Sequence, residues 1–290
     1  MTVTPNKPSR TAALRRLIAE PGLVVLPACY DALSARLIEQ AGFPAAFMSG
    51  FCISAARLAR PDAGLMSYGE VVEQARTICD AVTIPVLGDA DTGFGSAANV
   101  KRTVHGFASA GMAATMIEDQ VNPKRCGYAD GVAVVDRQEA LARMRAAIDA
   151  RDEGADTLIL GRTDAATVLG FDEGLRRAEA YQDMGCDIVY LEGLRTEAEL
   201  ERFCRRITVP KMFVAAEGSG HLIPSNATLD QMGIKFVCWA VTLLSLSIRA
   251  MSDGLRQLKD GTHPDRLATW GEINDVVGMT AYLAEEKRYR

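Results

Sequence analysis

The sequence predicts an α/β fold of the (β/α)8 TIM barrel class. Short apolar runs alternate with amphipathic helical stretches along most of the 290 residues. Several of these runs lack the polar–apolar alternation of half-exposed strands, as expected in a parallel sheet that helices cover on its outer face. Eight such units fit into about 240 residues, which is close to the usual size of this barrel.

The predicted strands are the apolar runs that separate the helical stretches. They cover residues 22–28, 44–49, 84–90, 113–119, 156–164, 187–193, 210–218 and 234–240. A doubly wound parallel sheet is the alternative fold. It is disfavoured because no GxGxxG motif follows the first run.

The predicted helices carry apolar residues at helical spacing, and several end in glycine, a common helix terminator. They cover residues 31–42, 68–82, 99–111, 137–154, 172–185, 196–207, 228–233 and 243–258, with loops predicted at 53–67 and 120–136. We expect a catalytic barrel domain over residues 1–260. The remaining residues 261–290 are helical in pattern, and a barrel does not need them, so we expect an oligomerisation segment that packs on another subunit.

Composition excludes several classes of protein. The net charge is −5 and the basic residues form no block, which argues against a nucleic-acid partner. No apolar run approaches the roughly 20 residues of a membrane span, and the N-terminus lacks the apolar core of a secretory signal. Seven cysteines are spread singly along the chain. They predict unpaired thiols in a reducing compartment, and hence a cytoplasmic protein.

Polar residues gather where the predicted strands end. In a barrel of this class the catalytic residues lie on the loops after the strands, so these side chains should meet at one rim. They are Ser49 and Gly50, Asp89 and Asp91, Glu118 and Asp119, Arg162 and Asp164, Glu192, and Glu217. Such a cluster of acids is unfavourable unless a cation lies among them. Oxygen ligands without histidine or cysteine suit Mg2+ or Mn2+.

The DxD spacing of Asp89 and Asp91 fits this metal site, because alternate residues of a strand point the same way. A helix-capping turn is the alternative for this motif. Arg162 is the natural partner of a substrate carboxylate, since its guanidinium binds carboxylates through two parallel hydrogen bonds. A structural ion pair with Glu192 or another rim acid is its alternative. Ser49 offers a hydroxyl beside close backbone N–H groups, although a plain tight turn would explain it equally.

The loop KRCGY places Lys124 and Arg125 beside Cys126. The two cations should favour the thiolate form of the cysteine, and Gly127 leaves the loop free to bend. A flexible loop that carries an acid or base over a bound substrate acts as a lid. An exposed cysteine without a role is the alternative.

Six stretches between residues 12 and 260 are specific when taken together. They are YDALSARLIEQAGFPAAFMSG, RPDAGLMSYGEV, PVLGDADTGFG, IEDQVNPKRCG, GRTDA and YLEG. With them the chain resembles the isocitrate lyase/phosphoenolpyruvate mutase superfamily, and within it the branch of methylisocitrate lyases and 2,3-dimethylmalate lyases. The resemblance implies a barrel whose C-terminal helix is swapped between subunits of a homotetramer, a dimer of dimers.

The resemblance also implies roles for the rim residues. Mg2+ would be held by Asp89 and Asp91, with Glu118 nearby. The substrate, a 2-hydroxy or 2-oxo carboxylate, would be bound by Ser49, Gly50, Arg162 and Gly127, with Asp62 on an adjacent gating loop. Glu192 would complete the catalytic rim with Arg162. Cys126 would be the general acid or base of the carbon–carbon lyases.

The chain departs from the sequence pattern of this branch in three places, and the residues there would shape the site around the far end of the substrate. Tyr128 stands where the lyases usually have histidine, and Val132 stands where they have lysine. Val214 and Ala215 replace an asparagine-containing turn, and Trp239–Ala240 replaces Tyr–Pro. A substrate smaller or more apolar than the tricarboxylate methylisocitrate is therefore expected.

Three functions remain open on the sequence. The first is a Mg2+-dependent lyase that cleaves a substituted malate or related 2-hydroxy di- or tricarboxylate to an oxo acid and a carboxylate. The second is an oxaloacetate hydrolase or decarboxylase, or an enzyme of phosphonopyruvate or phosphoenolpyruvate mutase type, on the same scaffold. The third is a metal-binding barrel without catalysis.

Overall fold

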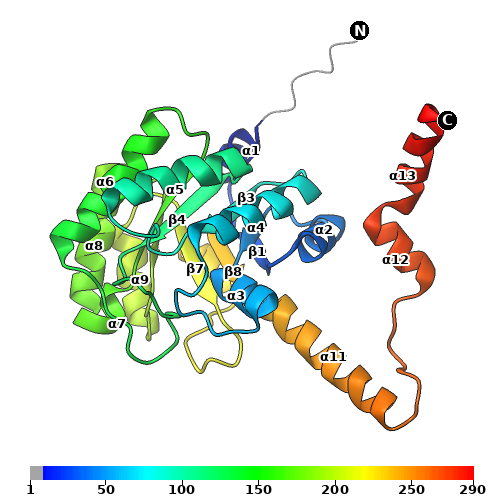
Figure 1. Ribbon diagram of the computed structural model, residues 1–290. Coiled ribbons are helices and arrows are strands. Elements are labelled where there is room, and N and C mark those ends of the chain that lie inside the picture. Colours follow the sequence, from blue (N-terminus) through cyan, green and yellow to red (C-terminus); the bar gives the residue numbers. More distant parts are fainter. Residues whose placement is uncertain (1–8) are drawn as a thin grey trace.

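The computed structural model describes residues 9–290 and contains a closed barrel of parallel strands (Figure 1). Its strands are β1 (Val24–Cys29), β2 (Ala46–Met48), β3 (Val86–Asp89), β4 (Ala114–Glu118), β5 (Leu158–Thr163), β6 (Ile188–Leu191), β7 (Lys211–Ala215) and β8 (Phe236–Trp239). Each strand pairs with the next in sequence, and β8 pairs with β1. The predicted fold class is confirmed, and each observed strand lies within or within one residue of a predicted one.

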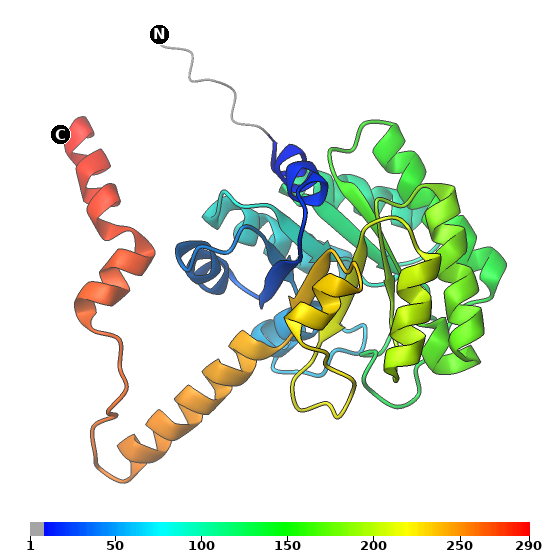
Figure 2. The ribbon, with the colours of Figure 1, turned by 180° about the vertical axis from the view of Figure 1, so that it is seen from behind.

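Helices cover the outside of the barrel, as the view from behind also shows (Figure 2). They are α1 (Arg10–Ala19), α2 (Ala32–Gln40), α3 (Gly50–Leu58), α4 (Tyr68–Ala81), α5 (Ala97–Ala110), α6 (Arg137–Asp152), α7 (Ala165–Leu169), α8 (Phe171–Met184), α9 (Glu197–Arg206) and α10 (Asn226–Gln231). The next helix, α11 (Thr242–Lys259), begins at the barrel and projects away from it (Figure 1). Capping boxes fix several helix starts, such as Ser67 with Glu70 at α4.

Two apolar cores hold the barrel together. One fills its interior with side chains from alternating strand positions, including Leu26, Leu87 and Phe236. The other lies between the strands and the helices, and includes Phe107 and Phe203. All five of these side chains are almost completely buried. The rigid strand ends that this packing provides are the platform for the site described below.

The prediction of a loop over residues 53–67 was partly wrong. Residues 50–58 form α3, and Ser49 is its N-cap, with its hydroxyl accepting a hydrogen bond from the backbone N–H of Cys52 at 3.3 Å. The serine before an apolar stretch is a helix-start signal. The arginines and the proline that follow this stretch obscured it.

The C-terminal residues leave the barrel as an arm (Figures 1 and 2). It consists of α11, α12 (Trp270–Val277), α13 (Met279–Glu286) and a last 3-10 turn (Lys287–Tyr289). Neither α12 nor α13 contains a buried residue within the described chain. The helical pattern predicted for residues 261–290 is present, whereas the domain division at residue 260 stays a prediction. Residues 1–8 of the predicted barrel domain lie outside the described residues.

Candidate active site

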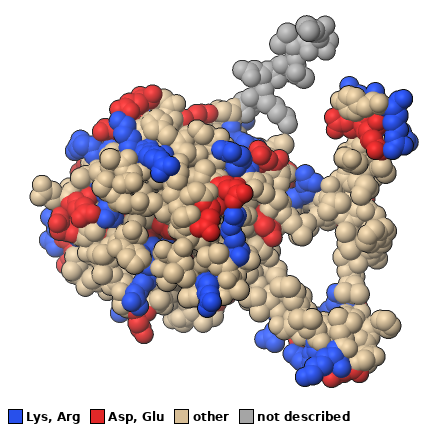
Figure 3. Space-filling model, in the orientation of Figure 1, with Lys and Arg blue, Asp and Glu red and all other residues tan. Residues whose placement is uncertain are grey.

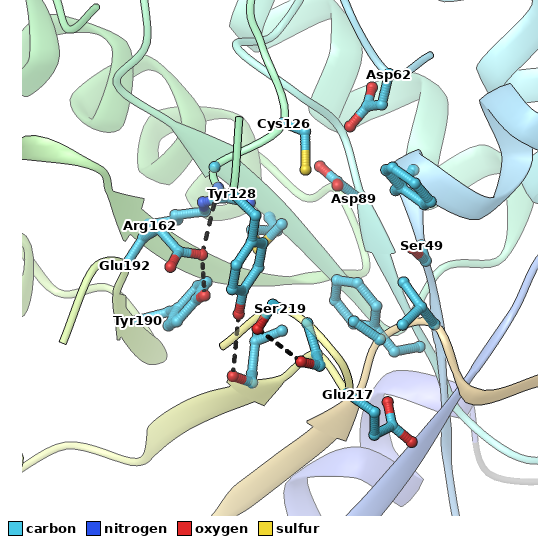
Figure 4. A pocket seen from close by; sticks show the side chains of 18 of the residues that line it. Ser49, Asp62, Asp89, Cys126, Tyr128, Arg162, Tyr190, Glu192, Glu217 and Ser219 are labelled. Atoms are coloured by element: carbon cyan, nitrogen blue, oxygen red, sulfur yellow. Dashed lines mark hydrogen bonds and ion pairs between the residues drawn. The ribbon is translucent and has the colours of Figure 1, made fainter. Parts of the chain in front are cut away.

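A cavity of about 260 Å³ opens at the C-terminal ends of the strands (Figure 4). Most of the predicted site residues line it: Ser49, Asp62, Asp89, Cys126, Gly127, Arg162 and Glu192. Gly50 and Asp91 lie beside it in a small adjoining pocket that shares Asp62 and Asp89. The structure therefore brings together side chains that are more than 140 residues apart in sequence.

Asp89 and Asp91 reach the site by a route that the DxD spacing did not predict. Strand β3 ends at Asp89, and Asp91 lies beyond it with a left-handed backbone conformation (φ 50°). The argument from strand alternation was therefore wrong for Asp91. Its backbone N–H donates to Asp89 Oδ1 at 3.0 Å. The left-handed conformation costs a non-glycine residue roughly 1–3 kcal/mol, and such strain is common at functional sites.

Lys124 has a role that the sequence analysis missed, since it was expected only to favour the thiolate form of Cys126. Its ammonium group is buried, 2.6 Å from Asp62 Oδ2 and 3.0 Å from Asp91 Oδ1. Burial opposes its charge, but Asp91 and Glu118 raise the pKa of Lys124 well above its usual value. The lysine therefore fixes the loop after β4 to the acidic cluster. In the sequence, the only sign of a role for Lys124 is that it lies two residues before Cys126.

The donors near Asp89 fit a hard divalent cation that keeps several waters. No three His, Cys, Asp or Glu side chains of the described chain converge closely enough to enclose a metal by themselves. Mg2+ typically needs only one or two carboxylates together with water. Both carboxylate oxygens of Glu118 are buried, and within residues 9–290 neither accepts a hydrogen bond. Gly50 leaves space in front of this cluster, because a Cβ there would lie 2.7 Å from Asp89 Oδ2.

Arg162 lies among three acids, so the structural ion pair considered as its alternative is present. Its Nε and Nη2 atoms donate to the two carboxylate oxygens of Asp164 at 2.9 and 2.8 Å. Nη1 lies 3.2 Å from Glu118 Oε2, and Nη2 lies 3.6 Å from Glu192 Oε2. Burial opposes its charge, yet Asp164 and Glu118 raise the pKa of Arg162 well above its usual value. It is thus a fixed cation on the cavity wall.

A second layer of hydrogen bonds positions Asp164. Asp119 was predicted as part of the rim, but it is buried and accepts hydrogen bonds from the Asp164 backbone N–H at 2.9 Å and from Arg177 at 2.9 Å. The Gln120 side-chain amide donates to Asp164 Oδ1 at 3.0 Å. Asp119 therefore orients Asp164, and Asp164 in turn orients Arg162. The adjacent acids Glu118 and Asp119 point to opposite sides of the strand, as strand geometry requires.

Glu192 follows β6 and is held from two sides. Its Oε1 atom accepts from the backbone N–H of Gly193 at 2.8 Å, and its Oε2 atom accepts from the hydroxyl of Tyr190. Burial raises the pKa of Glu192, although Arg162 opposes the shift. The carboxylate is thereby oriented on the cavity wall and made more basic than an exposed glutamate.

Cys126 lies at the cavity, but the prediction of a thiolate was wrong. Burial raises the pKa of the Cys126 thiol, and it outweighs the opposing effect of Arg162 and Lys124. The charges of those two cations are already shared with acids. The Cys126 backbone N–H donates to the Asp62 carbonyl at 3.0 Å, which joins the two loops. At neutral pH the side chain is a protonated thiol, a form suited to giving up a proton.

Gly127 is needed where the loop crosses Arg162. A Cβ atom at this position would lie 2.7 Å from Arg162 Nη2 and 3.1 Å from Glu192 Cγ. The predicted role of this glycine was loop flexibility. The structure shows a close approach of the backbone to the two charged side chains instead.

The opposite wall of the cavity is apolar. It is formed by the ends of β7 and β8, with Val214, Ala216, Ala240 and Val241. Glu217, which was predicted at the rim, lines this side, is exposed, and accepts a hydrogen bond from Thr242.

Comparisons with known proteins agree with this geometry. Residues 14–259 match the protein family described as phosphoenolpyruvate phosphomutase. The chain is also 36% identical over 282 residues to 2,3-dimethylmalate lyase of Eubacterium barkeri, which covers 96% of this chain and 97% of that protein. The chain belongs to the phosphoenolpyruvate mutase/isocitrate lyase superfamily. The predicted resemblance is thereby confirmed, and the protein is an enzyme of this superfamily of lyases and mutases.

Solved structures of this superfamily superpose closely on the chain. Oxaloacetate acetylhydrolase in complex with 3,3-difluorooxalacetate has a TM-score of 0.93 and 29% identity, over 97% of both chains. Phosphonopyruvate hydrolase in complex with oxalate and Mg2+ has a TM-score of 0.85 and 29% identity, over 97% of this chain and 99% of that one. Superfamily members thus bind small carboxylates and Mg2+. None of the helices in residues 9–290 is long and apolar enough to cross a membrane.

Proposed function

We propose that this enzyme is a Mg2+-dependent carbon–carbon lyase. Its substrate is a substituted malate or a related 2-hydroxy di- or tricarboxylate, and its products are an oxo acid and a carboxylate. The observation that carries the proposal is the half-buried thiol of Cys126, which lines the same cavity as the fixed cation Arg162 and the oriented carboxylate of Glu192. A lyase needs an acid that delivers a proton to carbon, and a protonated thiol can do so.

The metal would be held by Asp89 and Asp91, with Glu118 nearby, each partly through water. Mg2+, or Mn2+ in its place, supplies positive charge that stabilises negative charge on the substrate oxygens. Lys124 keeps Asp62 and Asp91 in position through its two ion pairs. The buried oxygens of Glu118, neither of which accepts a hydrogen bond within residues 9–290, and the space in front of Gly50 support this assignment.

The substrate carboxylate would be bound by Arg162 and by the start of α3. The Arg162 guanidinium is oriented by Asp164, so little further ordering is needed when a carboxylate arrives. The first turn of α3, which begins at Gly50 and follows Ser49 on the cavity wall, presents backbone N–H groups. Such N–H groups at a helix start favour an anion.

The reaction then needs one proton acceptor and one proton donor. Glu192 takes the proton of the substrate 2-hydroxyl group, and the oxygen electron pair forms the carbonyl of the oxo acid. The bond between C2 and C3 breaks, and its electron pair remains on C3, conjugated with the neighbouring carboxylate. Cys126 gives its thiol proton to C3. The raised pKa values of Glu192 and Cys126 suit these two roles.

Hydrolysis or decarboxylation of oxaloacetate, or phosphonopyruvate chemistry, is the second candidate. The high structural similarity to oxaloacetate acetylhydrolase favours it. Decarboxylation, however, has no need of a protein acid at the position of Cys126.

A panel of substrates tests the proposal. Purified enzyme with Mg2+, or with Mg2+ removed by a chelator, is incubated with 2,3-dimethylmalate, 2-methylisocitrate, oxaloacetate and phosphonopyruvate, and oxo-acid release is measured. We expect metal-dependent release from a 2-hydroxy acid. Turnover of oxaloacetate or phosphonopyruvate alone would replace the first candidate by the second.

We further propose a cytoplasmic homotetramer, a dimer of dimers in which the C-terminal segment is exchanged. All seven cysteines lie in the described residues and are free thiols, which supports a reducing compartment. The arm exposes large apolar side chains, such as Trp270 at 77%, and Figure 3 shows the hollow between it and the barrel. Sedimentation should give four times the 31.2 kDa of one chain.

A further inference from the structure

Tyr128 is fixed in the cavity wall by two contacts with a distant part of the chain. Its hydroxyl donates to the backbone carbonyl of Val214, on β7, at 3.3 Å. Its ring packs edge-on against the ring of His221, with centroids 4.7 Å apart and an interplanar angle of 89°. Burial raises the pKa of Tyr128, so the hydroxyl stays a donor. The loop after β4 is therefore joined to β7 and to the loop that follows it.

The ring of Tyr128 closes the cavity on this side. It lines the active-site cavity and also a pocket of about 10 Å³ behind it, which Phe213, His221 and Leu222 help to line. Figure 4 shows Tyr128 between the Cys126 end of the view and the Glu217 end, with its hydroxyl directed at β7. Without the ring, the cavity would extend into this second pocket.

The charges around Tyr128 decide which groups can lie beside it. Lys124 and Arg162 are the basic residues that the described chain contributes to the cavity wall, and both already pair with acids. Near Tyr128 the cavity wall is Val214 and Ala216, while the acid Glu192 and the ring of His221 help to line the small pocket behind it. A carboxylate here would lose its hydration and lie near the acid Glu192, while the neighbouring cation Arg162 is already shared by three acids, which is unfavourable.

We infer that Tyr128 is a specificity-determining residue that limits the C3 substituent of the substrate to a short alkyl group. The inference rests on the proposed lyase function and names the substrate class within it. A carboxymethyl group at C3 is excluded by charge, and a longer alkyl chain is excluded by the ring. The positions of the two carboxylates on C2 and C3 are unaffected, since they face the charged wall.

Three ligands that differ only at C3 separate these effects. 2,3-Dimethylmalate carries a methyl group there, 2-methylisocitrate carries a carboxymethyl group, and 2-methyl-3-propylmalate carries a propyl group. Their binding is measured by calorimetry with Mg2+ in a Cys126→Ser background, in which the proposed reaction does not finish. With Tyr128 present, we expect the methyl ligand to bind at least tenfold more tightly than either of the others, in the range typical of hydrophobic pockets, about 10–200-fold.

Two substitutions then test the ring itself. Tyr128→Ala should improve propyl binding relative to methyl by about tenfold, and it should leave the carboxymethyl ligand excluded because no cation is added. Tyr128→Phe, the matched control, keeps the ring and should keep the preference for methyl over propyl. If Tyr128→Ala does not fold, Tyr128→Leu, which also removes the ring but loses less volume, gives the same comparison.

The results separate this inference from the lyase proposal. Wild-type turnover decides the lyase function, whereas ligand preference decides the role of Tyr128. Equal binding of the methyl and carboxymethyl ligands, or binding of none of the three, would overturn the inference. An unchanged preference between methyl and propyl in Tyr128→Ala would overturn the role of the ring. The expected preferences without any wild-type turnover would leave the inference standing and remove the lyase.

Discussion

The two halves of the active-site cavity are built on the same barrel but from opposite kinds of residue. The charged half, at the ends of β3 to β6, contains Asp89, Glu118, Arg162 and Glu192, each buried. The apolar half, at the ends of β7 and β8, contains side chains such as Val214 and Ala216. Both halves rest on strands with the same parallel pairing. The difference therefore comes from the residues at the strand ends, not from the fold.

The comparison indicates that the charged half binds the substrate and transfers protons, whereas the apolar half selects the substrate. Charges in the charged half are fixed by one another, as Asp164 fixes Arg162, so they can bind and transfer protons without reorganisation. The apolar half has no such network and can only select by size and polarity. Substitutions in the charged half should lower kcat, and substitutions in the apolar half should mainly raise KM.

The largest effect is expected at Cys126. Cys126→Ser replaces the thiol by a hydroxyl, a much weaker acid, so kcat for oxo-acid release should fall by about 10²–10⁴. Cys204→Ser is the matched control, because Cys204 lies on α9 outside the cavity lining. Wild-type rates in Cys126→Ser would show that the charged half does not use this thiol.

The next effect is expected at Arg162. Arg162→Lys keeps a positive charge but cannot make two parallel hydrogen bonds to Asp164 or to a substrate carboxylate. The loss of hydrogen bonds between charged groups, roughly 1.5–3 kcal/mol each, should lower kcat/KM by about two orders of magnitude. Arg205→Lys, on the exposed side of α9, should change nothing. Steady-state kinetics of both variants measure the difference, and equal rates would remove Arg162 from substrate binding.

A smaller effect of a different kind is expected in the apolar half. Val214→Ala removes two methyl groups from the cavity wall, and each buried methylene-sized group contributes about 0.8 kcal/mol. KM for a substrate with a C3 methyl group should therefore rise by up to about 15-fold, with kcat little changed. A fall of kcat at constant KM would contradict the proposal that the apolar half acts mainly on substrate binding.

The smallest effect concerns pH. Because burial raises the pKa of Cys126, its thiolate fraction at pH 7 should be lower than that of an ordinary cysteine, whose pKa is about 8.5. Alkylation of Cys126 by iodoacetamide, followed by peptide mass spectrometry, should be at least about threefold slower at pH 7 than for a free thiol, and it should accelerate above pH 9. Fast alkylation at pH 7 would instead support the thiolate form of Cys126 that the sequence predicted.

The fold and the membership of the charged half could be predicted from the sequence because both follow local rules. Unalternating apolar runs mark buried parallel strands, and acids directly after those runs must lie at one rim. Arg162 and Glu192 were found in this way.

Contacts between distant segments could not be predicted. The ion pairs of Lys124 with Asp62 and Asp91 depend on how two loops meet. The left-handed conformation of Asp91 and the burial that raises the pKa of Cys126 likewise appear only once the chain is folded. Adjacent cations in the sequence suggested a thiolate, but in the structure Lys124 pairs with two acids and Arg125 donates to the backbone carbonyl of Asp130.

Deuterium transfer to carbon tests the central claim most directly. The enzyme is run with 2,3-dimethylmalate and Mg2+ in D2O, and the carboxylate product is analysed by mass spectrometry and NMR. If Cys126 delivers its proton to C3, every product molecule should carry one deuterium at the former C3, in a single stereochemical configuration. Release of the oxo acid with a racemic mixture of deuterated products, or with no deuterium at that carbon, would contradict the account.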